Sequence, residues 1–72
     1  MAYYKRIREL REDNDKTQKE VAEYLGMKQP QYHRYESGVR DIPCDFLASL
    51  AVLYNTSADY ILGLTDNPEP YK

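Results

Sequence analysis

Apolar side chains recur every three to four residues in five separate stretches of this 72-residue chain, the spacing of one buried helix face. The stretches are residues 3–13, Gln18–Leu25, Gln29–Ser37, Pro43–Tyr54 and Ala58–Leu62. Polar residues, prolines and glycines separate them, and no segment alternates apolar and polar residues as a half-buried strand does. The pattern therefore predicts an all-α fold of five helices.

The same spacing identifies the side chains that each predicted helix should bury. The stripe of the first helix is Tyr4, Ile7, Leu10 and Arg11, and the stripe of the fourth is Leu47, Leu50, Ala51 and Tyr54, with Cys44 and Phe46 partly included. The other residues of the first helix, Lys5, Arg6, Arg8, Glu9 and Glu12, cover its remaining surface. Each helix should therefore turn one apolar face toward a shared core.

Local signals fix the ends of the second and third helices. Thr17 and Glu20 form a capping-box pattern, in which the threonine accepts from the Glu20 backbone N–H and the Glu20 side chain reaches back. Gly26 can take the left-handed conformation that ends a helix. The third helix lacks a good N-cap residue, and Pro30 is acceptable in its first turn because no N–H is needed there.

The stretch Gln18–Gly38 joins the second and third helices at Gly26. Two short helices at a steep angle across a tight glycine turn indicate a helix-turn-helix. The small residue Ala22 lies where the two helices would cross closely. The other apolar positions fall in the same register, and they are Val21, Leu25, Met27, Tyr32 and Tyr35. All of these positions together are a fairly specific signal.

This register resembles the lambda-repressor-like helix-turn-helix family of prokaryotes and their phages, also called Cro-type or XRE. The matching segments are RIRELRED, TQKEVAEYLG, YESG, RDIP and SADYILGLTDNP. The resemblance covers about residues 3–66 and implies a compact five-helix DNA-binding domain over residues 1–66, followed by an extended tail over residues 67–72. It also implies that the third helix enters the major groove of double-stranded DNA, and that a homodimer binds a near-palindromic operator.

Outward positions of the third helix match the recognition helix of that family. The residues expected to read base edges are Lys28, Gln29, Pro30, His33 and Arg34. Arg34 is the strongest candidate, because an arginine can bond guanine O6 and N7 together. Pro30 offers an apolar surface, for example to a thymine methyl group. His33 is left open between a base contact, a phosphate contact and a solvated helix residue.

Three more residues are expected near the DNA backbone. Gln18 matches the family's glutamine that bonds a phosphate and braces a second glutamine, here Gln29, and a helix N-terminus is in any case an anion site. The alternative interpretation of Gln18 is a surface residue of good helix propensity without a role in binding. Gln31 is expected at the rim of the groove, and Arg40 is expected to touch phosphate from the loop after the third helix.

The resemblance also implies two structural contacts. Arg11 and Glu36 match a largely buried ion pair that fixes the third helix against the first. At the other end of the chain, four residues leave more apolar surface than so short a helix can bury alone, and the family often makes its two-fold contact there. These residues, expected in a homodimer interface, are Ala58, Tyr60, Ile61 and Leu64.

Charge and composition indicate where in the cell the protein is expected and how its charge is distributed along the chain. The net charge is −2, but residues 1–40 carry nine Lys/Arg against seven Asp/Glu and residues 41–72 carry one against five, so the halves are +2 and −4. Local field matters more than total charge for steering a ligand. The single cysteine permits no internal disulfide. The N-terminus lacks the apolar run of a signal peptide, and no apolar stretch is long enough to span a bilayer. A cytoplasmic protein is expected.

The sequence contains no pattern of residues that indicates an enzyme. The chain has one histidine, one cysteine, no glycine-rich phosphate loop and no acids at metal-ligand spacing. We expect no enzyme, metal, cofactor or small-molecule ligand, and we expect Cys44, which matches a core leucine position, to be a small buried residue.

The predicted function is that of a sequence-specific DNA-binding transcriptional regulator, in particular a repressor. The rival interpretation is a protein-interaction module on the same fold, such as an antitoxin that binds a partner protein. The outward face of the third helix favours DNA, because it is basic and polar and has no exposed aliphatic stripe.

Overall fold

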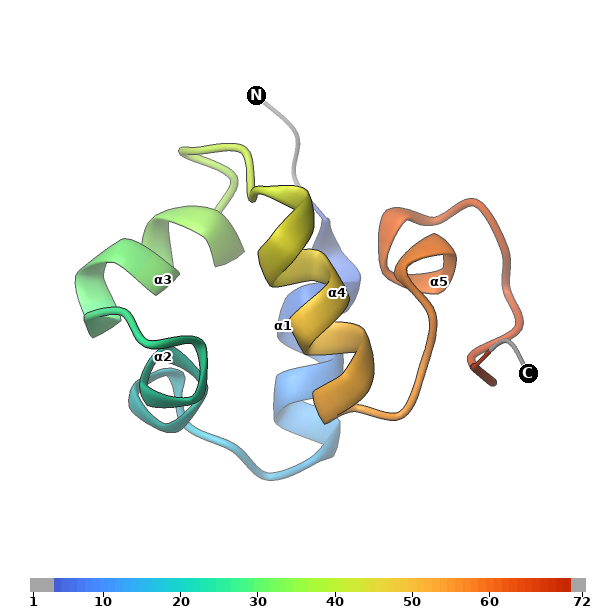
Figure 1. Ribbon diagram of the computed structural model, residues 1–72, viewed down its shortest axis with the longest axis horizontal. Helices are drawn as coiled ribbons and strands as arrows, with labels where there is room; N and C mark the ends of the chain where they lie inside the picture. The colour runs from blue at the N-terminus through green and yellow to red at the C-terminus, as the bar shows by residue number, and fades with distance from the viewer. Residues whose placement is uncertain (1–3, 71–72) are drawn as a thin grey trace.

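The computed structural model describes residues 4–70, which form five α-helices and no strand (Figure 1). The helices are α1 (Lys5–Asp13), α2 (Gln18–Leu25), α3 (Gln29–Glu36), α4 (Cys44–Leu53) and α5 (Ala58–Leu62). The predicted all-α fold of five helices is confirmed. Tyr4 is extended and precedes α1 as its cap, so the helix begins later than predicted, and Tyr3 lies outside the described residues.

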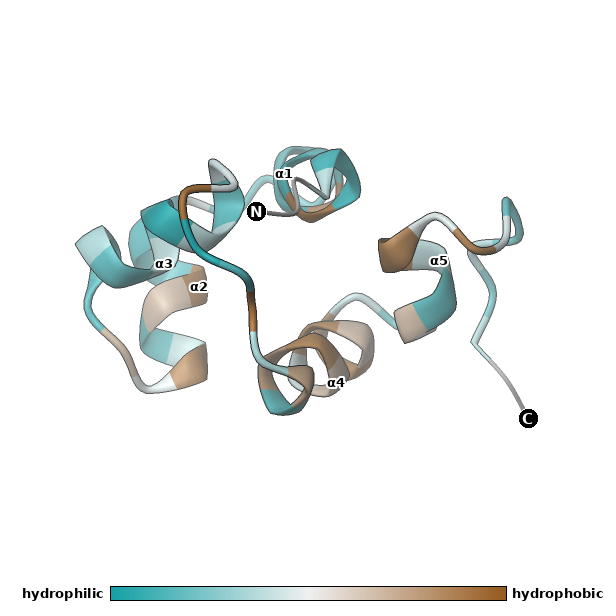
Figure 2. Cartoon of the chain, turned by 90° about the horizontal axis from the view of Figure 1, so that it is seen from above, coloured by the Kyte–Doolittle hydropathy of each residue, from teal (hydrophilic) through white to brown (hydrophobic). Residues whose placement is uncertain are grey.

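Helices α1 and α4 occupy the middle of the molecule, with α2 and α3 at one end and α5 at the other (Figure 1). Seen from above, α1 and α4 lie on opposite sides, and the hydrophobic faces of the helices turn toward the space between them (Figure 2). Helix α3 is largely hydrophilic in the same view. Most of its surface is therefore left outside the core.

The core draws apolar side chains from every helix. It consists of Ile7, Val21, Ala22, Tyr32, Ile42, Leu47, Leu50, Ala51, Tyr54 and Ile61. Removing such side chains from water is the main favourable contribution to folding, at about 25 cal/mol per Å² of apolar surface. Around this core, the ring centroids of Tyr35 and Phe46 lie 6.0 Å apart and join α3 to α4.

The helix ends follow the local signals. The Glu20 N–H donates to Thr17 Oγ1 at 3.1 Å and the Thr17 N–H donates to Glu20 Oε1 at 3.0 Å, so both halves of the capping box are present. Gly26 ends α2 with φ of 74°, in the left-handed region that favours glycine. Helix α3 has no side-chain cap, and Pro30 lies in its first turn.

Two residues at the start of α4 differ from expectation. The prediction that Cys44 is a buried packing residue is wrong, because its side chain is exposed. Cys44 is the first residue of α4, directly after Pro43, and the core begins one turn later with Leu47. Ile42 contributes to the core instead, although it lies outside all five predicted helices, in the segment between the third and the fourth.

Arg6 ties α1 to α5 and to the segment that follows it. Its Nη1 donates to the carbonyl oxygens of Tyr60 at 2.8 Å and Thr65 at 2.6 Å, and its Nη2 donates to Asp66 Oδ1 at 2.8 Å. The guanidinium carbon also lies 4.1 Å from the centroid of the Tyr60 ring, a cation–π contact. The sequence pattern had placed Arg6 on the solvent side of the helix and missed this clamp.

The chain beyond α5 keeps further contact with the domain. The Thr56 hydroxyl, before α5, donates to the Pro68 carbonyl. Within the segment itself, the Glu69 N–H donates to Asn67 Oδ1. The boundary at residue 66 stays a prediction, and residues 71–72 lie outside the described part of the chain. Among residues 4–70, none of the helices has the length and apolar character needed to cross a bilayer.

Candidate nucleic-acid interface

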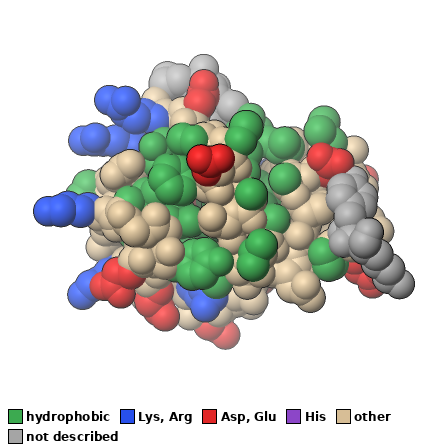
Figure 3. All heavy atoms as spheres, in the orientation of Figure 1, with side chains coloured by type: hydrophobic (Ala, Val, Ile, Leu, Met, Phe, Trp, Pro, Cys, Tyr) green, Lys and Arg blue, Asp and Glu red, His purple; other side chains and the backbone are tan. Residues whose placement is uncertain are grey.

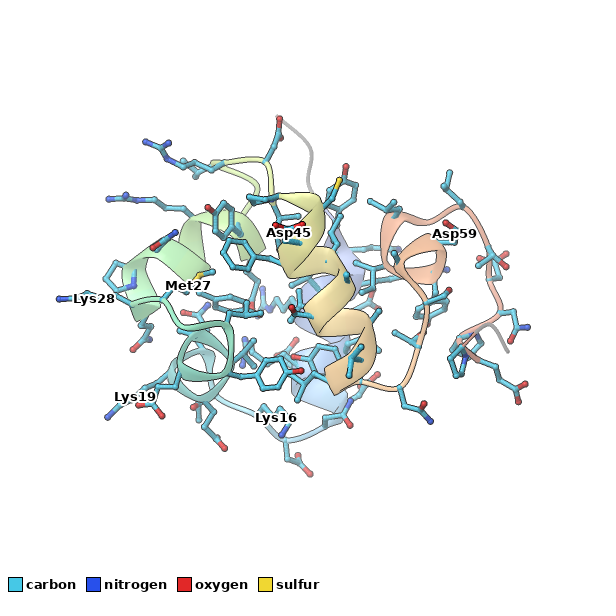
Figure 4. All side chains as sticks on the ribbon, in the orientation of Figure 1. Lys16, Lys19, Met27, Lys28, Asp45 and Asp59 are labelled. Atoms are coloured by element: carbon cyan, nitrogen blue, oxygen red, sulfur yellow. The ribbon has the colours of Figure 1, made fainter. Side chains whose placement is uncertain are left out.

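Helix α3 divides its residues sharply between core and solvent. Tyr32 is 0% exposed and Glu36 is 4% exposed, while Tyr35 is half-buried. All five residues predicted to read base edges are exposed, as is Gln31, and the five are Lys28, Gln29, Pro30, His33 and Arg34. In the stick view, the Lys28 side chain points away from the body of the molecule (Figure 4). The structure thus gathers the predicted side chains on one outward face.

This outward face is positively charged. Over residues 28–40 the basic side chains are Lys28, Arg34 and Arg40, all exposed, and the acidic one is Glu36, which is buried and paired with Arg11. Several lysine and arginine side chains lie at the end of the molecule formed by α2, α3 and the following loop, and acidic side chains lie beside the lowest of them (Figure 3). Residues 28–40 therefore carry a net positive charge although the whole chain has a net charge of −2.

A bidentate ion pair holds α3 against α1. Arg11 Nε donates to Glu36 Oε2 at 2.9 Å, and Arg11 Nη2 donates to Glu36 Oε1 at 3.0 Å. Arg11 Nη1 also donates to the Lys16 carbonyl at 2.8 Å, in the turn before α2. The pair expected from the resemblance is thus present. It connects three elements around the base of the outward face, with two parallel charge-assisted hydrogen bonds.

The environment of Glu36 keeps it ionised. Burial alone would raise the pKa of this carboxyl, but the hydrogen bonds from Arg11 and Gln18 and the positive charge of Arg11 outweigh burial and lower it. The hydrogen bond to Glu36 likewise raises the pKa of Arg11. Both side chains therefore carry full charge in the folded protein, and each needs the other.

Tyr32 occupies a position where the resembled family usually has valine or isoleucine. The ring is fully buried, so the core accommodates its extra volume. Burial and the neighbouring Glu36 carboxylate raise the pKa of Tyr32. The phenol is therefore a neutral structural residue, which leaves the other side of α3 to face a ligand.

Gln18 braces α3 in a different way from the one expected. Its Nε2 lies 3.2 Å from Glu36 Oε1 and 3.2 Å from His33 Nδ1, whereas the family pattern had placed its partner at Gln29. Gln18 is the first residue of α2, level with the last turn and a half of α3, so it meets residues there and not at the helix start. The amide nitrogen of Gln18 thus has other partners than Gln29, and the phosphate contact of Gln18 stays a prediction. Together, Arg8, Arg11, Gln18, His33, Glu36 and Ser37 line a hollow between α1, α2 and α3.

Arg40 follows α3 in a loop that is fastened to the helix end. The Arg40 N–H donates to the Arg34 carbonyl at 3.1 Å. This bond holds the two exposed arginines at one end of the outward face. At the other end, the Gln31 amide reaches the Tyr35 hydroxyl at 3.5 Å, a weak contact that leaves Gln31 available.

The four residues expected in a dimer interface differ in exposure. Leu64 is 74% exposed, and Ala58 and Tyr60 are half-buried, the latter beneath the Arg6 guanidinium. Ile61, in contrast, is 1% exposed and belongs to the core of the single chain. The expectation that Ile61 offers apolar surface to a second copy is therefore wrong. Within residues 4–70, no group of three or more potential metal ligands is present.

Comparison with known proteins identifies the protein family to which this chain belongs. A family model described as helix-turn-helix matches residues 7–61, which is more than half of the chain. The chain therefore belongs to the helix-turn-helix family of the Cro (XRE) type, and the resemblance seen in the sequence is confirmed. This is a family of regulators and not of enzymes.

Three curated relatives come from Bacillus subtilis strain 168. The chain is 44% identical to the HTH-type transcriptional regulator YobD over 94% of its length, 43% identical to the regulator ImmR over 88%, and 38% identical to the regulator AnsR over 81%. It spans 61%, 50% and 50% of those proteins, or about half of their length. No solved structure matches the chain significantly.

Proposed function

We propose that this chain is the DNA-binding domain of a transcriptional regulator and reads the major groove of double-stranded DNA with α3. The observation that carries the proposal is the outward face of α3, where exposed basic and amide side chains stand on a helix whose other face is locked into the core. An α-helix fits the major groove, and these side-chain types match its hydrogen-bond pattern. The names of the relatives support the same class.

Individual roles follow from side-chain chemistry. Arg34 is proposed to bond guanine, and Gln29 is proposed to bond adenine through paired donor and acceptor groups. Lys28 would reach a base or a phosphate, and Pro30 would pack against a thymine methyl. Arg40 is proposed to bind phosphate, because it lies exposed in the loop that follows the helix.

Gln18 and Gln31 take supporting roles. Because the Gln18 amide nitrogen is committed to Glu36 and His33, we propose that backbone N–H groups at the start of α2 bind phosphate there, while the Gln18 side chain braces α3. Gln31 is exposed beside the base-reading residues and would contact the groove rim. Such contacts set register and not sequence preference.

The proposal is tested by titrating labelled duplexes, first a random pool and then a duplex selected from it. Affinity should fall steeply with salt, because bound phosphates release counterions. Arg34→Ala should reduce affinity for the selected duplex about tenfold or more while affecting random duplex less. Lys5→Ala removes one exposed positive charge from α1 and serves as the matched control. Absence of duplex binding at low salt would refute the proposal and favour a protein partner, as for an antitoxin.

We further propose that the regulator is a cytoplasmic homodimer that represses by occupying a near-palindromic operator. Two-fold operators match two-fold proteins. Leu64 supports this as an apolar side chain that is 74% exposed, beside Ala58 and Tyr60. Val52 on α4 is 75% exposed and provides a matched control. Sedimentation should show Leu64→Glu weakening self-association while Val52→Glu does not, and a wild-type monomer at high concentration would contradict the dimer.

A further inference from the structure

The contacts of the Gln18 side chain determine which way its amide points. The same atom, Nε2, lies 3.2 Å from Glu36 Oε1 and 3.2 Å from His33 Nδ1. An ionised carboxylate can only accept hydrogen bonds, so the atom facing Glu36 must be the NH₂ group and not the amide oxygen. The orientation of the amide is thus set by chemistry, because the opposite orientation would place oxygen against oxygen.

Glu36 imposes this orientation because Arg11 keeps it charged. The carboxylate accepts two hydrogen bonds from the guanidinium, at 2.9 and 3.0 Å, and the pair is largely buried. Protonation of Glu36 would break this bidentate arrangement. The amide of Gln18 therefore meets a fixed acceptor, and one of its two hydrogens is committed there.

The second amide hydrogen determines the tautomer of His33. It points to Nδ1, which must accept it and therefore cannot carry a proton in the neutral ring. A neutral imidazole has one N–H, so the proton lies on Nε2. The His33 side chain is exposed, and among residues 4–70 no hydrogen bond reaches its Nε2. The ring thus presents a single N–H donor, Nε2–H, to solvent, and the contact of Nδ1 with Gln18 holds the ring in place.

We propose that Gln18 is a positioning residue that holds His33 as the Nε2–H tautomer, and that His33 uses this donor to bind an acceptor on duplex DNA. The inference rests on the proposed DNA-binding function and deepens it. Suitable acceptors are purine N7, guanine O6 and thymine O4 at the base edges, or a phosphate oxygen. Cytosine N4 and adenine N6 are donors and cannot serve. Where the acceptor is a base edge, His33 would discriminate among bases, because its outward nitrogen can donate a hydrogen bond but cannot accept one.

The tautomer is measured directly by long-range ¹H–¹⁵N correlation of the ring, without DNA. His33 is the only histidine in the chain, so its two ring nitrogens are assigned without ambiguity. At about pH 8, where imidazole side chains are generally neutral, Nε2 should show the shift of a protonated nitrogen and Nδ1 that of an unprotonated one. A proton on Nδ1 would overturn the proposal.

A pair of variants tests the role of Gln18. Gln18→Met keeps the side-chain length but removes the amide, and both ring nitrogens should move toward averaged shifts as the two tautomers interconvert. Gln31→Met makes the same change on the exposed face of α3 and should leave the His33 pattern unchanged. An unaltered pattern in Gln18→Met would overturn the positioning role, whatever happens to its stability.

DNA binding tests the role of the donor. With the selected duplex, His33→Leu should weaken affinity about tenfold, the effect expected for one specific hydrogen bond. His33→Gln should retain most of it, because the Gln amide nitrogen can reach the place of ring Nε2. The acceptor is identified with duplexes that carry one modification each: a 7-deazapurine, a thymine with its O4 replaced, or a methylphosphonate in place of one phosphate. The acceptor is the position at which the modification weakens binding of the wild type but not of His33→Leu.

The outcomes separate this inference from the proposed function. If wild type binds duplex and His33→Leu binds equally tightly, the donor role fails while the proposed function stands. If wild type binds no duplex, both fail, although the ring spectra still establish the tautomer. Because the His33 side chain is exposed, thermal unfolding of His33→Leu should match wild type, and so a loss of affinity reports on the contact.

Discussion

Two arginines of α1 fasten opposite ends of this domain, and they do so in different ways. Arg11 binds a carboxylate, and the side chains of this pair are 14% and 4% exposed. Arg6 binds two backbone carbonyls and Asp66, whose side chain is fully exposed. The first contact holds α3, which we propose reads DNA, and the second holds α5 and the chain that follows it.

The two ends of the domain depend on charge to different degrees. Loss of Arg11 or Glu36 would strand a buried charge, which is far more costly than the loss of the attraction itself. Loss of Arg6 would instead leave two partly buried carbonyl groups, which carry no net charge, and the fully exposed Asp66, which water can reach. We therefore expect the α3 end to tolerate change less well than the α5 end.

Glu36→Ala should have the largest effect. It leaves Arg11 without its carboxylate and removes the acceptor of Gln18, and breaking a buried pair typically costs about 3–5 kcal/mol in the free energy of unfolding. Glu23→Ala removes an exposed glutamate from α2 and is the matched control. Chemical denaturation of the two variants measures the difference, and equal stabilities would refute the ion pair as the main brace of α3.

Arg6→Ala should have an intermediate effect. The variant loses bonds from a charged donor to the Tyr60 and Thr65 carbonyls, and such bonds contribute about 1.5–3 kcal/mol. Arg8→Ala, which removes an exposed arginine paired with Glu12 on the same helix, should cost about 0–1 kcal/mol. Hydrogen exchange should show faster opening of α5 in Arg6→Ala while α3 keeps its protection. Loss of protection in both helices alike would show that the two ends are not independent.

Acid should weaken the α3 end selectively. The pKa of Glu36 is lowered in the folded state, so its contribution to stability is present above the unfolded glutamate pKa of about 4.3 and is lost as pH falls through the lower folded value. The free energy of unfolding of wild type should therefore decrease below about pH 4.5, and that of Glu36→Gln should decrease less steeply. Parallel pH profiles for the two proteins would contradict this.

Alkali should produce a smaller effect from the core. Burial raises the pKa of Tyr54 to about 12, above the value of a tyrosine in the unfolded chain. A raised folded pKa gives stability that is present below the unfolded pKa and lost as pH rises through the folded one, so stability should fall above about pH 10. Tyr54→Phe should flatten this alkaline decline, and an unchanged slope would show that Tyr54 does not cause it.

Sequence reasoning succeeded where the controlling interactions are local. The capping box at Thr17, the left-handed Gly26 and the limits of α2 depend on residues within one turn of one another. The ion pair of Arg11 with Glu36 joins distant residues, and it was expected only because the family pattern supplied it. The exposed face of α3 followed from helical spacing, once Tyr32 and Tyr35 were assigned to the side that faces the domain.

The contacts that the sequence missed are made through space. Arg6 reaches Tyr60, 54 residues away, and a helical pattern describes only one face of its own helix and not what packs against it. Gln18 was assigned the family's partner, but its amide meets His33 because of the particular side chains in this hollow. Cys44 kept the helical spacing of a core residue, yet the helix begins there, outside the core.

Mapping the surface that duplex DNA touches tests most directly whether α3 reads DNA. Backbone amide shifts of the ¹⁵N-labelled protein would be followed while the selected duplex is added. If α3 reads DNA, the largest changes are expected at Lys28–Arg34, Gln18 and Arg40, and small ones on the side of α4 that bears the exposed Val52. Changes concentrated on α4, with α3 unaffected, would contradict the claim that α3 reads DNA.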